Sequence, residues 1–230
     1  MVTIMSEGRG RKAAIGLLGS VIAIAMLFCA LFSLGLITFE DRREVSLMPD
    51  DFGNLYSGML ADGVMVGYGE IVYKSGDKYA GDFDDGVYSG KGTFSSKSGW
   101  EYRGEFKKGL PDGEGVFKDT NGGVFFGVFK EGKITGEGSF SPESGWVYDG
   151  MWDQGRQVGE GSFTYKDGSV YRGGFLDGAA SGSGFYKDKK GWSYEGEFSQ
   201  GLFEGEGTLT FKNGEMITGQ WSASKPVKPE

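Results

Sequence analysis

Aromatic and small residues alternate with polar residues along most of this chain. The segment Tyr79–Phe83 reads YAGDF, so its two aromatic residues and its glycine fall on one face of an extended strand. Gly90–Phe94 reads GKGTF and repeats this two-residue alternation a few positions later. Two strands of this kind, separated by glycine-containing segments, are typical of a β-hairpin.

The hairpin pattern has a fixed period of 23 residues. It recurs seven times without insertion or deletion, and a half unit beginning at Ile217 follows. Asn121-Gly122, Asp167-Gly168 and Asn213-Gly214 predict turns between units, where a positive φ is needed. Such a period indicates a linear array in which each unit packs on its neighbours. The full units begin at Tyr56, Tyr79, Tyr102, Phe125, Tyr148, Tyr171 and Tyr194.

Glycine is the outlier of the composition, at 44 of 230 residues, and most of it falls in five columns of the repeat. Glycine on the aromatic face leaves room for rings from neighbouring strands to lie flat over the backbone. We therefore expect a continuous spine of stacked rings and an all-β fold. The predicted core residues of the repeats are Tyr79, Phe83, Tyr102, Phe106, Phe129, Tyr148, Trp152, Tyr171, Phe175, Tyr194 and Phe198.

The segment Tyr102–Gly115 reads YRGEFKKGLPDGEG, which resembles the MORN (membrane occupation and recognition nexus) repeat. The resemblance extends over residues 56–221, as seven and a half repeats. It implies an elongated, single-layer antiparallel sheet of stacked hairpins with a groove along it. It also implies scaffolding, membrane association and partner binding without intrinsic catalysis.

Residues 13–38 contain no charged side chain. At 1.5 Å per residue such a stretch can cross a bilayer, so we expect one transmembrane helix before the repeats. Basic residues in the segment 1–12 favour a cytoplasmic N-terminus, which places the repeats on the extracytoplasmic side of a single-pass membrane protein. A cleaved signal peptide is the alternative, although the apolar stretch exceeds a usual signal-peptide core.

The segments flanking the repeats lack the 23-residue pattern. Residues 39–55 are interpreted as a short linker and residues 222–230 as a tail rich in Pro and Lys. An open array has unpaired strand edges, here near Tyr56 and Trp221. Self-association, where it occurs, is therefore expected to use an end of the array.

The chemistry of the side chains argues against several classes of function. The chain has no His, a single Cys and a net charge of −8, so we expect no metal site, no cofactor and no nucleic acid partner. Glu114, Glu137, Glu160 and Glu206 form a column opposite the aromatic face, which we interpret as a solvated outer surface. We expect no catalytic residues and no enzymatic activity.

Trp100, Trp146 and Trp192 recur in alternate repeats, at a spacing of 46 residues. Each ring either packs over the turn between its own unit and the next, or forms one of a row of aromatic platforms for a partner. The leading hypothesis is a membrane-anchored interaction platform that binds a protein partner or assembly near the membrane. The alternative is a surface module that binds a glycan or cell wall through this row.

Overall fold

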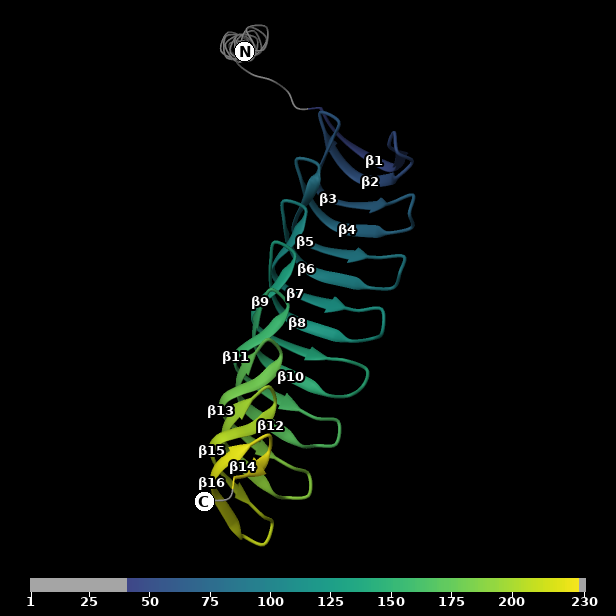
Figure 1. Ribbon diagram of the computed structural model, residues 1–230. Coiled ribbons are helices and arrows are strands. Elements are labelled where there is room, and N and C mark those ends of the chain that lie inside the picture. The colour runs from purple at the N-terminus through teal and green to yellow at the C-terminus, as the bar shows by residue number, and fades with distance from the viewer. Residues whose placement is uncertain (1–40, 228–230) are drawn as a thin grey trace, which may run out of the picture. The chain divides into compact units, whose positions relative to one another are not determined.

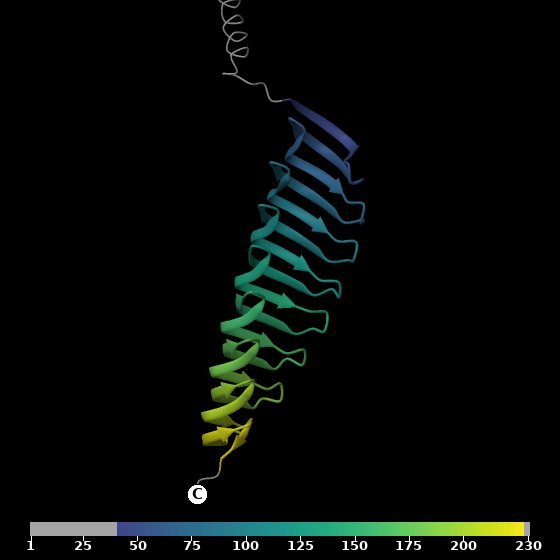
Figure 2. The same cartoon turned by 45° about the horizontal axis from the view of Figure 1, so that its top comes forward.

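The computed structural model describes residues 41–227, which form one open antiparallel sheet (Figure 1). Strands pair in chain order, and Figure 2 shows a single layer running from purple to yellow. The expected all-β, single-layer fold is confirmed. The strands are β1 Arg42–Pro49, β2 Leu55–Ala61, β3 Val64–Val72, β4 Lys78–Asp84, β5 Val87–Ser95, β6 Glu101–Lys107, β7 Leu110–Lys118, β8 Val124–Lys130, β9 Lys133–Ser141, β10 Val147–Asp153, β11 Arg156–Thr164, β12 Val170–Leu176, β13 Ala179–Lys187, β14 Ser193–Ser199, β15 Leu202–Thr210, β16 Met216–Ser222 and β17 Lys225–Pro226.

Two kinds of turn join the strands. The hairpin turn within a repeat has positive φ at both central residues, 48° at Asp85 and 77° at Gly86 in the second repeat, as a two-residue type I′ turn requires. The inter-repeat turn is longer and also ends in a glycine of positive φ. The turns predicted at Gly122, Gly168 and Gly214 are of this second kind, with φ of 82°, 89° and 87°.

A bulge bends the second strand of each repeat. In the second repeat Gly81 faces Gly92 but Asp82 faces Ser89, so Gly90 and one further residue are inserted between these pairs. Gly90 has a φ of 56°, a conformation that favours glycine. Bulges bend and twist the strand that carries them, and their recurrence curls the sheet towards its aromatic face. This curvature lets a single-layer sheet bury large rings.

The aromatic spine runs through all the repeats without a gap. Tyr102 meets Phe106 of its own strand edge-to-face at 5.1 Å between ring centroids, and meets Phe129 of the next repeat at 4.8 Å. The same alternation of contacts links Tyr56 to Trp221. The spine buries all the predicted core residues, together with Phe125. Successive repeats are therefore joined by ring contacts as well as by strand pairing.

The ring over each glycine pair comes from the same hairpin, and not from a neighbouring one. A Cβ atom on Gly115 would lie 2.5 Å from the Tyr102 ring, and one on Gly104 would lie 2.5 Å from the Tyr102 hydroxyl oxygen. The Tyr102 hydroxyl donates a hydrogen bond to the main-chain carbonyl of Glu105 at 3.0 Å. Each hairpin thus clamps its own tyrosine, because the ring spans the two paired strands.

Both ends of the array differ from the sequence-based expectation. The expected linker, 39–55, contains β1, which pairs with β2, so the strand of Tyr56 is not an edge. Val45 and Met48 of β1 pack against the core. At the other end the tail folds back as β17 and pairs with two residues of β16. Neither segment carries the repeat signature, which is why the pattern alone did not reveal these caps.

The predicted transmembrane helix, residues 13–38, and the basic segment 1–12 lie outside the described residues. Within residues 41–227 there is no helix long and apolar enough to span a membrane.

Candidate functional site: an aromatic trough

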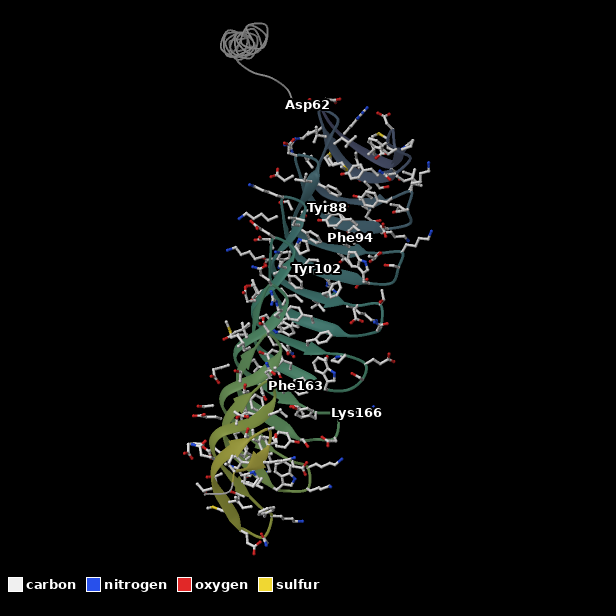
Figure 3. All side chains as sticks on the ribbon, viewed as in Figure 1. Asp62, Tyr88, Phe94, Tyr102, Phe163 and Lys166 are labelled. Carbon is white, nitrogen blue, oxygen red and sulfur yellow. The ribbon has the colours of Figure 1, made fainter. Side chains whose placement is uncertain are left out.

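The curled sheet forms a trough with the spine as its floor. One wall is built near the hairpin turns by the residue nine positions after the first aromatic of each repeat. The opposite wall is built near the inter-repeat turns by the residue fifteen positions after that aromatic, together with the alternate tryptophans. The first wall comprises Met65, Tyr88, Pro111, Ile134, Gln157, Ala180 and Phe203, and the second comprises Ile71, Phe94, Phe117, Phe140, Phe163, Tyr186 and Leu209. Figure 3 labels Tyr88, Phe94, Tyr102 and Phe163 along this face.

An aromatic side chain closes the trough near its N-terminal end. Tyr88 stacks on the floor ring of Tyr79, with centroids 3.7 Å apart and planes 13° apart. It also approaches Phe94 of the opposite wall at 6.3 Å, and its hydroxyl contacts that of Tyr73. One residue therefore reaches from wall to wall.

Phe203 closes the trough in the same way near the C-terminal end. Its ring stacks on Tyr194 at 3.8 Å, with planes 4° apart. Tyr186 and Trp192 of the opposite wall lie 6.3 Å from it. The two closures occur in the second and seventh repeats.

Between these closures the first wall carries shorter or non-aromatic side chains, from Pro111 to Ala180. A hollow of about 410 Å³ opens here and takes its lining from both walls and the floor. Its volume lies in the range of ligand pockets, and its lining is mostly apolar. The lining residues are Trp100, Tyr102, Pro111, Phe117, Phe129, Gly132, Lys133, Ile134, Gln154 and Gly155.

The three alternate tryptophans are half-buried in the second wall. Trp100 stacks on Phe94 at 5.0 Å and Trp146 stacks on Phe163 at 4.9 Å, whereas Trp192 lies tilted against Tyr186 at 5.2 Å. Trp100 lines the hollow, and the other two do not. Sequence reasoning missed Pro111 and Ile134; the signal was the change from aromatic to smaller residues in their column.

Polar side chains occupy the tryptophan column in some intervening repeats. Asp77 accepts a hydrogen bond from the backbone N–H of Lys97 at 2.8 Å, and Ser169 accepts one from Lys189 at 3.2 Å. Hydrogen bonds from the Ser75 hydroxyl and from Lys97 lower the pKa of Asp77. In the first and fifth repeats the column therefore carries a polar group that ties successive inter-repeat turns together, whereas the three tryptophans build the wall.

The buried tyrosines of the floor have a structural role at neutral pH. Burial raises the pKa of Tyr102, Tyr148 and Tyr171 to about 12. Their hydroxyls stay protonated and donate to backbone carbonyls of the bulge region. These hydroxyl groups are therefore not arranged for acid–base chemistry near neutral pH.

The outer face of the sheet is mostly polar. Glu114, Glu137, Glu160 and Glu206 are exposed there, as the sequence predicted. A hollow of about 730 Å³ on this face is larger than the one in the trough, but charged and hydroxyl side chains line much of it. We favour the trough as the candidate site because its apolar lining can exclude water. Among residues 41–227 no cluster of three potential metal ligands is present.

Comparison with solved structures finds chains that are distantly similar to this one. The TCP domain of Drosophila melanogaster SAS-4 (dCPAP), solved in complex with a proline-rich motif of Ana2, is 9% identical, with 77% of this chain and 88% of that chain covered and a TM-score of 0.42. The TCP10 domain of Danio rerio CPAP is 10% identical over 76% of this chain and 93% of that one, with a TM-score of 0.27. Similarity at this level does not extend to function. Comparison with curated proteins finds no match.

The MORN repeat family model matches seven consecutive segments of the sequence: residues 56–78, 79–101, 102–124, 125–145, 148–170, 171–193 and 194–216. These matches begin at the same positions as the structural repeats and together cover more than half of the chain. The chain therefore belongs to the MORN repeat family.

Proposed function

We propose that this chain is a membrane-anchored, non-enzymatic scaffold whose trough binds a protein partner. The observation that carries the proposal is the open central section of the trough, between the closures at Tyr88 and Phe203. The strands beneath it are paired on both sides, so recognition there depends mainly on side chains. A partner would insert large apolar side chains beside Trp100 and Ile134 and place polar groups near Lys133.

The membrane part of the proposal rests on residues 13–38. An uncharged stretch of this length is sufficient to cross a bilayer. The charges that flank it favour a cytoplasmic N-terminus, with the repeats extracytoplasmic. In this arrangement the array presents its partner on the extracytoplasmic side, on one stiff body formed by the joined spine.

Self-association through an array end belongs to the same proposal. β17 covers only Trp221 and Ser222 by strand pairing, which leaves the Met216 end of β16 without a described neighbour on that side. Met216 is 61% exposed. A second chain could add a strand at this edge.

The direct test is recovery of partners from native membranes with the full chain and two variants. Ile134→Trp fills the hollow, whereas Thr218→Trp adds the same ring to the exposed outer face. We expect proteins recovered with the wild type and with Thr218→Trp to be lost with Ile134→Trp. Equal recovery with all three chains would contradict the trough as the site.

The glycan alternative is tested with the triple variant Trp100→Ala, Trp146→Ala and Trp192→Ala. If the wild type binds glycan or cell-wall preparations and the folded triple variant does not, the alternative replaces the protein-binding proposal. If the wild type binds no such preparation, the alternative is eliminated.

A further inference from the structure

The fourth repeat departs from the others on the outer face of the sheet. Phe126 stands one position after the first aromatic of its repeat and is 60% exposed. The corresponding residue in every other repeat is small, polar or charged. These residues are Ser57, Ala80, Arg103, Asp149, Arg172, Glu195 and Thr218.

Three further apolar residues on this face, one on the same strand, one on β7 and one on β10, extend this departure into an apolar patch, defined as Val116, Phe126, Val128 and Met151. Val116 lies directly across the strand pair from Phe126. Val116 is 36% exposed and Met151 is 38% exposed, while Val128 is half-buried. An exposed apolar cluster on a polar face marks an interaction surface, since its contact with water is otherwise unfavourable.

Carboxylates surround most of this patch. Glu114 is paired across the strands with Val128, and Glu137 with Met151. Residues paired across adjacent strands form rows that run across the sheet. In the row of Phe126, Ser139 comes next and Asp149 follows it. Within residues 41–227 none of these three carboxylates is in a salt bridge. Arg103 lies at the other end of the row, beyond Val116.

A hollow adjoins the patch on its acidic side. It has a volume of about 340 Å³ and includes Glu137, Asp149, Met151 and Glu160 in its lining. A lysine or arginine side chain can enter a space of this size, lay its aliphatic stem along Met151 and bring its charge to the carboxylates.

We propose that the outer face of the fourth repeat is a second docking surface, which binds a basic and apolar peptide segment of another protein. Apolar side chains of the segment cover Phe126, and a Lys or Arg enters the adjoining hollow. A second copy of this chain fits poorly, because its own outer face would bring Glu114 and Glu137 against like charges. The site lies on the face opposite the trough and does not depend on the function proposed for the trough.

The probe is a fluorescent peptide in which lysine and leucine alternate, compared with glutamate–leucine and lysine–serine peptides of equal length. Fluorescence anisotropy with the full chain measures affinity at low and high salt. We expect the lysine–leucine peptide to bind best and to weaken with salt, since exposed charges are screened. Absence of lysine–leucine binding, or equal binding of the glutamate–leucine peptide, would overturn the proposal.

Matched variants locate the binding site. Phe126→Ser removes the exposed ring and should weaken lysine–leucine binding about tenfold or more. Tyr68→Ser removes a ring of similar exposure, 64%, elsewhere on the outer face and should leave affinity unchanged. Glu137→Gln with Glu160→Gln should weaken binding and reduce its salt dependence, whereas Glu206→Gln should not. Equal affinities for Phe126→Ser and Tyr68→Ser would place the binding elsewhere and refute the proposal.

Discussion

The hydroxyl of Tyr102 donates a hydrogen bond at 3.0 Å to the main-chain carbonyl of Glu105, a residue of the same strand that lies opposite the bulge. The equivalent bond is present in the first, second, fifth, sixth and seventh repeats, at 2.8–3.3 Å. The fourth repeat has Phe125 at this position and lacks the hydroxyl. The bond fixes the ring to its own strand, and its absence in one repeat allows a direct measurement of its contribution.

Phe125→Tyr should stabilise the array by about 0.5–1.5 kcal/mol, the usual net contribution of a hydrogen bond. The new hydroxyl would reach the main-chain carbonyl of Val128. In the fourth repeat Val128 corresponds to Glu105 of the third repeat. Urea denaturation measures the change. The reverse substitution Tyr102→Phe is the control and should destabilise by a similar amount. A destabilising Phe125→Tyr would show that the fourth repeat differs in more than the missing hydroxyl.

Gly115→Val should destabilise the array by about 3 kcal/mol, at the upper end of overpacking effects. The added Cβ would meet the Tyr102 ring at 2.5 Å, and the hydrogen bond to Glu105 holds that ring in place. Thr93→Val, on the outer face, is the control and should have a small effect. Thermal unfolding distinguishes them, and similar melting temperatures for the two variants would mean that the glycine columns are not packing positions.

Ala223→Gly should stabilise the C-terminal cap by about 1 kcal/mol. Ala223 has a φ of 47°, a left-handed conformation that costs a residue with a Cβ roughly 1–2 kcal/mol. The control, Ala179→Gly in a regular strand, should be destabilising. Melting temperatures that fall in both variants would contradict the strain assigned to the cap.

Alkaline pH should unfold the array. The pKa of about 12 for Tyr102, Tyr148 and Tyr171 exceeds the value of about 10 for an unfolded tyrosine. Between these values the folded chain retains protons that the unfolded chain releases, so stability falls as pH rises through this range and is unaffected below it. Urea unfolding at about pH 8 and about pH 11 measures the loss. Equal stability at both values would contradict the burial of these hydroxyls.

The repeat and its spine were predictable because they depend on a fixed 23-residue period and on spacings of two and four residues within one strand. The bulge at Gly90 was not, since it appears only when the register of Gly81 against Gly92 is known. The closure of the trough by Tyr88 was missed because its contacts with Tyr73 and Tyr79 cross between strands. The contribution of β1 could not be read from a segment that lacks the repeat pattern.

The candidate site was likewise predictable only in part from the sequence. Trp100 was noticed from its 46-residue spacing with Trp146, and this spacing suggested three equivalent platforms. The structure places only Trp100 of the three in the hollow, because the hollow depends on Pro111 and Ile134 of the opposite wall. Which residues face each other across a curled sheet follows from the curvature, and the curvature follows from the bulges.

Photo-crosslinking from the trough in native membranes tests the central claim most directly. A photoreactive amino acid replaces Lys133, which lines the hollow, and a matched variant carries it at Lys212 in an exposed inter-repeat turn. We expect irradiation of the full chain to give a discrete protein adduct from position 133 and none from position 212, with the attached peptide identified by mass spectrometry. An identical set of adducts from both positions, or no protein adduct from position 133, would contradict the binding of a protein partner in the trough.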